Sequence, residues 1–188
     1  MSPRQLIVFA WVGLAIVWLV TGVLAKRTVR KQTSASRLLH LAFTTLGFVL
    51  IFNSSWRLGP LDNWLYDPSA ATAYFGAALT LIGIAFAIWA RFYLGSNWSG
   101  SVTVKADHAL VQSGPYALVR HPIYTGILLA ALGSSLAYPR ARGFVGLAIL
   151  VITLRIKSRL EERFMQEQFG AQYAGYKQDV KALVPFIW

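Results

Sequence analysis

The sequence predicts an all-α integral membrane protein with about five transmembrane helices, and two observations lead to this fold class. The 188-residue chain is 56% hydrophobic and 13% charged, with a mean hydropathy of +0.51, which is too apolar for an ordinary soluble domain. Its apolar residues also gather in long uncharged runs, separated by charged segments. The absence of cysteine excludes disulfides, thiolate catalysis and cysteine-ligated zinc.

The first three runs each have the length of a bilayer crossing. Residues 6–25 form an uncharged run that is about 30 Å long as a helix, which matches the hydrocarbon core of a membrane. Residues 38–56 and 68–90 form two more uncharged runs. The run at residues 38–56 contains His40, a rare ionisable residue at membrane depth, and we expect it to be hydrogen-bonded to the backbone or to Thr44.

The fourth and fifth runs predict two further helices of different character. The fifth apolar run, residues 143–154, gives only about 18 Å of helix, so we expect the helix to continue through residues 155–169 and to carry its charges into the membrane boundary. An ordinary cytoplasmic helix end with surface ion pairs is the alternative. The fourth run, residues 122–139, is rich in small residues that allow a neighbouring helix to approach closely. These are Gly126, Ala130, Ala131, Gly133, Ser134 and Ser135.

The distribution of cations predicts how the chain is oriented. Lysine and arginine crowd residues 26–37, which makes that loop cytoplasmic, so five crossings place the amino terminus outside and the carboxyl terminus in the cytoplasm. The membrane is then a bacterial or archaeal inner membrane, or one of the endoplasmic reticulum type. A cleavable signal peptide is the alternative for the first run, but its apolar part is too long and the cations after it would be exported.

The net charge of +11 does not by itself indicate nucleic acid. The cations lie between apolar runs and not in a patch interleaved with aromatic side chains, so membrane lipids with anionic headgroups are the expected counter-charge.

A polar segment directly before the fourth run contains the main candidate site. In the stretch SGPYALVRHPIYTG, Arg120, His121 and Pro122 follow one another, with Tyr116 and Tyr124 on either side. Pro122 suits the first turn of a helix, whose free backbone donors then lie beside His121. Taken singly, these residues are also explained as a helix start, interfacial aromatics and headgroup anchors. Together they predict a binding site at the membrane surface.

Three motifs of the carboxyl-terminal half resemble one family. They are LGSNWSGSVTVKADHALVQSGPYALVRHPIYTG at 94–126, EERFMQEQFGAQYAGYKQDV at 161–180, and the final PFIW. In this order they resemble the isoprenylcysteine carboxyl methyltransferases and their prokaryotic relatives and, more distantly, the phospholipid N-methyltransferases. The resemblance implies a single integrated domain, with transmembrane helices 1–3 in residues 1–92. Residues 93–188 would be the catalytic half, with helices 4 and 5 and a cytoplasmic tail.

The resemblance implies transfer of a methyl group from S-adenosylmethionine to a lipophilic or lipidated acceptor at the cytoplasmic membrane face. Carboxyl O-methylation of an isoprenylcysteine-like substrate is the most specific expectation. The cofactor pocket would be formed by the loop before helix 4, with one glutamate of the tail closing over it. The implied cofactor-binding residues are His108, Leu110, Val111, Gly114, Tyr116, Arg120, His121, Pro122, Tyr124 and Glu162.

The acceptor side of the predicted site is less defined. Family members use an arginine one turn before the first glutamate, where this chain has Lys157, and a lysine lacks the bidentate fork that holds a carboxylate. A carboxylate acceptor is already ionised at neutral pH, whereas an amine needs a base such as Glu161 or His121. The predicted catalytic residues are Glu161, Lys157, Arg159 and Arg155, with Asn97 and Trp98 at the acceptor pocket and no metal.

Two other classes of function remain open. A membrane-embedded NADPH-dependent reductase of a sterol-like lipid has a similar histidine-proline element, but usually with an asparagine before the tyrosine and an acid two residues after it. Here those places hold Ile123 and Gly126. A non-enzymatic membrane protein is the second alternative. The sequence has neither a GxGxxG fingerprint after a strand nor a P-loop, so a nucleoside cofactor would bind among loops and helix ends.

Overall fold

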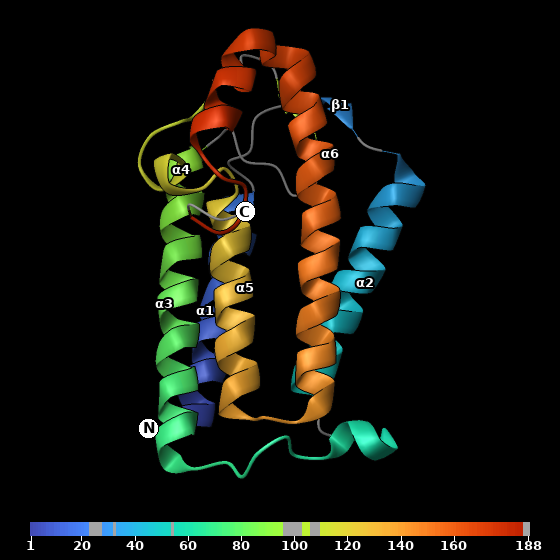
Figure 1. Cartoon of the computed structure of the whole chain (residues 1–188), viewed down its shortest axis with the longest axis vertical. Coiled ribbons are helices and arrows are strands. Elements are labelled where there is room, and N and C mark those ends of the chain that lie inside the picture. The colour runs from blue at the N-terminus through green and yellow to red at the C-terminus, as the bar shows by residue number, and fades with distance from the viewer. Residues whose placement is uncertain (23–27, 32, 54, 96–102, 106–109, 186–188) are drawn as a thin grey trace.

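The computed structural model describes residues 1–22, 28–31, 33–53, 55–95, 103–105 and 110–185. Its long helices run side by side, and each reverses the direction of the one before it (Figure 1). The helical expectation is confirmed, with the addition of a short antiparallel pair of strands that the sequence did not indicate. The elements are α1 (Pro3–Gly22), β1 (Thr28–Lys31), α2 (Ser34–Phe52), the 3-10 turn η1 (Gly59–Asp62), α3 (Ala70–Leu94), β2 (Thr103–Lys105), α4 (Pro115–Leu118), α5 (Pro122–Ala137) and α6 (Ala141–Asp179).

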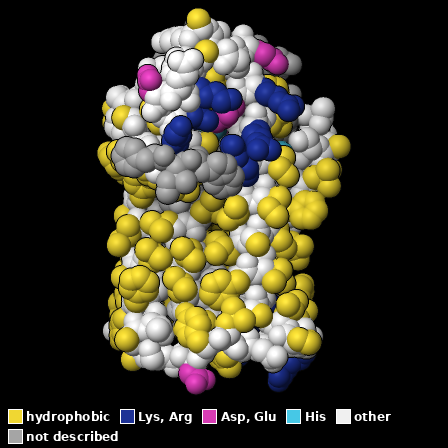
Figure 2. Space-filling view, viewed as in Figure 1, with side chains coloured by type: hydrophobic (Ala, Val, Ile, Leu, Met, Phe, Trp, Pro, Cys, Tyr) yellow, Lys and Arg dark blue, Asp and Glu magenta, His cyan; other side chains and the backbone are white. Residues whose placement is uncertain are grey.

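The surface of the bundle is that of a membrane protein. Within the described part of the chain, α1, α2 and α3 are long and apolar enough to cross a bilayer. The apolar helix α5 has 16 residues, about 24 Å. Figure 2 shows apolar side chains around the middle of the molecule, with most of the visible lysines and arginines gathered at one end. That end is where the charged second half of α6 extends beyond the apolar part.

Helices α3 and α5 pack at very short range along a glycine seam. A Cβ atom on Gly83 would lie 2.5 Å from the carbonyl oxygen of Gly126, and one on Gly133 would lie 2.5 Å from that of Gly76. The two glycines of each helix are seven residues apart and therefore lie on the same face. All six small residues predicted to admit a neighbouring helix are buried, so this prediction is confirmed.

A second close contact joins α2 to α6. A Cβ atom on Gly146 would lie 2.5 Å from the carbonyl oxygen of Gly47. Because the two helices run antiparallel (Figure 1), moving toward the start of α2 corresponds to moving toward the end of α6. This register brings His40 level with Thr153, and both line one groove between the helices.

The end of the bundle opposite the cationic end is held by a buried arginine. Arg142 is 4% exposed, and its Nη1 lies 3.1 Å from Asp62 Oδ1 and 3.3 Å from the carbonyl oxygen of Trp56. The Leu65 amide also donates to the Pro139 carbonyl at 2.8 Å. These contacts fix the segment between α2 and α3 against the turn between α5 and α6.

The chain reverses near its end and returns to the start of α5. Gly170 has a φ of +50°, which interrupts α6 and is favourable for glycine. The tail that follows pairs with the polar segment, because the His121 amide donates to the Ala182 carbonyl at 3.0 Å. The Thr125 hydroxyl donates to the Leu183 carbonyl at 2.7 Å. Ala182 and Leu183 are therefore part of the wall around His121.

Candidate active site

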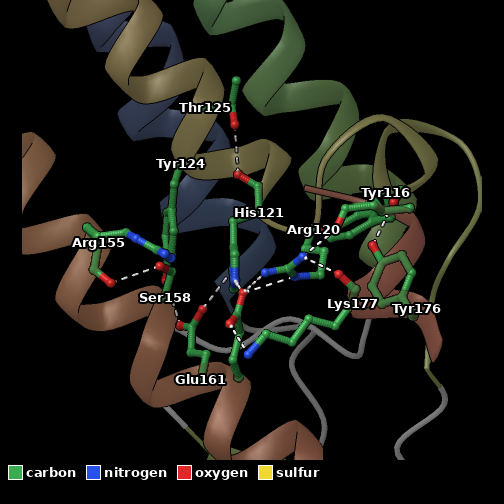
Figure 3. A network of polar contacts seen from close by, with 12 residues as sticks. Tyr116, Arg120, His121, Tyr124, Thr125, Arg155, Ser158, Glu161, Tyr176 and Lys177 are labelled. Carbon is green, nitrogen blue, oxygen red and sulfur yellow. Dashed lines mark hydrogen bonds and ion pairs between the residues drawn. The ribbon is translucent and has the colours of Figure 1, made fainter. Parts of the chain in front are cut away.

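The two polar segments singled out in the sequence meet at the cationic end of the bundle (Figure 3). His121 Nε2 lies 3.3 Å from Glu162 Oε1, and His121 Nδ1 lies 3.4 Å from Glu161 Oε2. The ring thus bridges two adjacent carboxylates of α6. Only a doubly protonated imidazole offers an N–H donor to both.

Helix α5 positions the histidine and a tyrosine on the same turn. Pro122 is the first residue of α5 and His121 its N-cap, as the sequence predicted. The His121 and Tyr124 rings stack nearly parallel with their centroids 5.6 Å apart. The Tyr124 hydroxyl donates to Glu161 Oε1 at 2.6 Å, and Lys157 Nζ lies 5.4 Å from the centroid of the Tyr124 ring. Lys157 therefore stands at the edge of this cluster.

Arg120 holds Glu162 from the other side. Its Nε and Nη2 donate to Glu162 Oε1 at 3.0 and 2.5 Å, and both side chains are 6% exposed. Its Nη1 donates to the carbonyl oxygens of Lys177 and Val180. Lys177 Nζ lies 3.3 Å from Glu162 Oε2. The Arg120 guanidinium is thus largely occupied within the protein and organises the site, instead of projecting freely into it.

Burial and ion pairing act in opposite directions on the charges of this cluster. Burial by itself would lower the pKa of His121, but hydrogen bonds to Glu161 and Glu162 outweigh it and raise the pKa. Burial would raise the pKa of Glu162, but His121 and Arg120 lower it to about 2. The pKa of Glu161 is lowered as well, against its burial, by His121, Lys157 and Tyr124. Both glutamates are therefore held ionised and are weak bases.

Apolar and aromatic side chains form the neighbouring wall. Tyr116 is 7% exposed, and its carbonyl oxygen accepts a hydrogen bond of 2.6 Å from the Tyr176 hydroxyl. Val111 packs in the same cluster. Gly114 has a φ of +59°, and a Cβ atom there would lie 2.5 Å from the Tyr93 ring, so glycine is required.

The remaining predicted residues differ in their burial, and three of them are not among the described residues. Leu110 is half-buried at the edge of the described segment, and Arg159 is exposed. Arg155 is half-buried, and its charge interacts with those of Glu162 and Arg120. Asn97, Trp98 and His108 lie outside the described residues.

Two sets of contacts were absent from the predicted site. Tyr173 and Tyr176, both buried, pack edge to face at 6.0 Å, and their spacing in the motif FGAQYAGY was a signal for them. The backbone carbonyls of Lys177 and Val180 and the Lys177 ammonium also complete the cluster. A carbonyl that accepts from a distant arginine has no signature in the sequence, because every residue has one.

Fold and site together define a helical membrane protein with a buried ionic cluster at one end of its bundle. Comparison with known proteins is specific: the family model for phospholipid methyltransferase matches residues 71–172, and the chain belongs to this family. The protein-S-isoprenylcysteine O-methyltransferase of Saccharomyces cerevisiae is 32% identical over 135 residues, which are 67% of this chain and 55% of that protein. The methanethiol S-methyltransferase 1 of Bradyrhizobium diazoefficiens is 27% identical over 162 residues, with 78% and 53% covered.

A solved structure has the same fold. The eukaryotic intramembrane Ras methyltransferase ICMT aligns with a TM-score of 0.51 and 21% identity, over 83% of this chain and 54% of that one. The resemblance to the isoprenylcysteine methyltransferases is thereby confirmed, as is a helical membrane fold. This chain spans little more than half the length of these relatives.

Proposed function

We propose that the protein transfers a methyl group from S-adenosylmethionine to a lipophilic acceptor at the cytoplasmic membrane face, most specifically by carboxyl O-methylation of an isoprenylcysteine-like substrate. The observation that carries the proposal is the bridge from His121 to Glu161 and Glu162 at the end of the apolar belt. It places fixed charges where a polar cofactor and an apolar acceptor can both arrive. Membership of the phospholipid methyltransferase family supports the reaction class.

The chemistry of the residues present fits S-adenosylmethionine. The cofactor, when bound, supplies an electrophilic methyl group on a positively charged sulfur. Ionised Glu162 offers a negative charge, the N-terminus of α5 offers free backbone donors, and the apolar wall around Tyr116 suits an aromatic base. Arg120 holds Glu162 in place. The proposed cofactor-binding residues are His108, Leu110, Val111, Gly114, Tyr116, His121, Pro122, Tyr124 and Glu162.

The electrostatics favour an acceptor that needs no general base. Because the pKa of Glu161 is lowered, this carboxylate is a poor proton acceptor. A carboxylate acceptor is already ionised at neutral pH and needs only a cation to hold it. Lys157 is suitably placed at the edge of the cluster, and Arg155 and Arg159 lie on the neighbouring turns of α6. We assign the acceptor's anionic group to Lys157, with Arg155 or Arg159 as the alternative cation and Asn97 and Trp98 bordering the group.

The proposed orientation places the amino terminus outside and the site in the cytoplasm. It rests on the crowding of lysine and arginine at the site's end of the bundle. This orientation is tested by fusing to the carboxyl terminus a reporter that is active only in the cytoplasm, and we expect that reporter to be active. A signal only from an export-dependent reporter would contradict the orientation.

Binding and turnover can be measured separately on the purified protein in detergent. We expect calorimetry to detect binding of S-adenosylmethionine and not of NADPH. We also expect a labelled methyl group to be transferred from the cofactor to an S-prenylated cysteine. The acceptor panel includes a phospholipid amine and a small thiol, because the family and the Bradyrhizobium relative include such activities by name. Binding of NADPH alone would overturn the function, and transfer only to an amine or thiol would overturn the carboxylate acceptor.

A further inference from the structure

Lys177 is a charged residue of the site to which the proposed function gives no role. It lies in the last turn of α6, and its carbonyl oxygen accepts a hydrogen bond from Arg120 Nη1 at 3.2 Å. The preceding residue, Tyr176, is buried and donates to the Tyr116 carbonyl at 2.6 Å, so the backbone of this turn is held in place. The Lys177 side chain itself is 52% exposed and extends from this turn toward the centre of the cluster (Figure 3).

The two carboxylate oxygens of Glu162 differ in how firmly they are held. Oε1 accepts from Nε and Nη2 of Arg120 and lies 3.3 Å from His121 Nε2. Among the described residues, the ion-pair partner of Oε2 is the Lys177 ammonium, 3.3 Å away. One oxygen is thus bound by buried side chains that cannot move freely, and the other is paired with an exposed ammonium.

The contact between Lys177 and Glu162 is easily broken. An ion pair with an exposed lysine gains little Coulomb energy and costs the conformational entropy of a long side chain. The lysine holds Glu162 by one charge on a flexible stem, whereas the fork of Arg120 donates to it twice. Lys177 can therefore leave Glu162 by side-chain rotation alone, while its backbone carbonyl stays bonded to Arg120.

The charges of the cluster require such a movement when a cation arrives. Among the described residues paired with one another here, Arg120, His121 and Lys177 are three cations that face two carboxylates, Glu161 and Glu162. S-adenosylmethionine carries one net positive charge, because its sulfonium and ammonium outweigh its carboxylate. A further positive charge would be repelled by the excess cation unless a cation withdraws. Lys177, the exposed member, is the one able to withdraw.

We propose that Lys177 is a displaceable counter-ion, which pairs with Glu162 in the cofactor-free protein, gives way to the sulfonium of S-adenosylmethionine, and returns when the sulfonium charge is lost. The inference rests on the proposed function and adds a residue to it. Methyl transfer breaks the S–CH₃ bond, leaves its electron pair on sulfur and forms the O–CH₃ bond of the ester. The product S-adenosylhomocysteine therefore has a neutral sulfur and no net charge.

The return of Lys177 would offset a disadvantage of the buried carboxylate. A fixed anion beside a sulfonium stabilises the reactant more than the transition state, in which the positive charge on sulfur is already decreasing. Re-formation of the ion pair between Lys177 and Glu162 supplies a positive charge as that of the sulfur disappears. Lys177 acts in this way as a positioning residue for the charge of Glu162 and does not touch the reacting atoms.

The experiment replaces Lys177 with methionine, which keeps the stem and removes the charge. Calorimetry in detergent without an acceptor should show a Kd for S-adenosylmethionine about threefold lower, because an exposed ion pair no longer has to be broken. The Kd for S-adenosylhomocysteine should not change. Lys177→Arg retains the cation and should bind both ligands as the wild type does. Lys181→Met, at an exposed position of the same tail, is the matched control and should also leave both values unchanged.

Three results would overturn the inference. Weaker binding of S-adenosylmethionine to Lys177→Met would show that the lysine is a ligand of the cofactor's carboxylate. An equal gain for both ligands would assign the displacement to the ammonium, which both share, and not to the sulfonium. Unchanged affinity for S-adenosylmethionine would show that Lys177 does not compete with it.

Chemical labelling follows the lysine directly. An ammonium paired with a carboxylate loses its proton less readily and is acylated more slowly than a free one. Mass spectrometry should therefore find faster acetylation of Lys177 in the wild type with S-adenosylmethionine bound, and no acceleration with S-adenosylhomocysteine. Lys181 should be labelled at one rate throughout. An unchanged or slower reaction of Lys177 with S-adenosylmethionine would contradict its displacement.

These measurements separate the inference from the proposed function, because neither needs an acceptor. If Lys177→Met binds S-adenosylmethionine more tightly but no acceptor of the panel is methylated, the counter-ion role stands and the proposed function fails. If methyl transfer occurs while Lys177→Met binds both ligands as the wild type does, the function stands and the inference is wrong. Absence of S-adenosylmethionine binding to the wild type would refute both.

Discussion

Glu162 has three cationic neighbours, Arg120, His121 and Lys177, and Arg120 is the most buried of them. Replacing Glu162 with glutamine removes the carboxylate that the Arg120 guanidinium faces while retaining the shape of the side chain. We expect the free energy of unfolding to fall by about 3 kcal/mol, because a buried charge loses its partner. Thermal unfolding in detergent, followed by circular dichroism, measures this. Asp179→Asn, at an exposed position at the end of the same helix, is the matched control and should have little effect.

The same cluster predicts how stability depends on pH. The pKa of Glu162 is lowered from 4.5 to about 2, so its stabilising contribution is complete above about pH 4.5 and is lost as the pH falls toward 2. The pKa of His121 is raised above 6.5, so its contribution is complete below that pH and is lost as the pH rises through the raised value. The cluster therefore stabilises the fold most between about pH 4.5 and 6.5.

Two variants separate these contributions in melting temperatures recorded across pH. Glu162→Gln should flatten the acidic limb of the profile, and His121→Asn should flatten the alkaline limb. A variant whose profile runs parallel to that of the wild type would show that the group concerned does not titrate in the way described.

At the scale of elements, the glycine seam between α3 and α5 sets the position of His121, because α5 begins with the residue after it. Gly83→Ala places a Cβ atom 2.5 Å from backbone atoms of α5, which no rotamer change can relieve. We expect a loss of about 1–3 kcal/mol in the free energy of unfolding and weaker cofactor binding as α5 shifts. Unfolding and calorimetry measure the two effects.

Gly13→Ala in α1 provides the control for this prediction. A Cβ atom there has no neighbour within 4 Å, so the substitution should leave stability equal or slightly higher through better helix propensity. Equal destabilisation by the two alanines would show that the seam is not tightly packed.

At the scale of the whole molecule, the site is completed by residues about 60 positions away in the sequence. The tail after α6 pairs with the start of α5 and buries Leu183, which is 1% exposed, whereas the neighbouring Val184 is 39% exposed. Leu183→Asp should detach the tail, because it buries a charge without a partner. We expect at least a tenfold weaker affinity for S-adenosylmethionine by calorimetry with the helical content retained. Val184→Asp should bind as the wild type does, and a similar loss in both would contradict the role of the tail.

Much of this organisation was accessible from the sequence because it depends on local patterns. Pro122 predicted the start of α5, and the small residues of the fourth run predicted its close packing. The motifs around His121 and Glu162 predicted two halves of one site. Arg120 was predicted to contact a cofactor, yet its donors are largely occupied by Glu162 and tail carbonyls. Neither partner follows from the residues around Arg120.

The sequence by itself determined a helical membrane protein with a polar site at one end, because hydrophobicity, helix starts and motif order are written along the chain. The tertiary structure alone decided which groups form ion pairs and hydrogen bonds, and that the buried His40 Nδ1 has no hydrogen-bond partner among the described residues. The physical reason is that such contacts depend on the register between helices. That register is set by the sum of many weak packing contacts, and no single residue carries it.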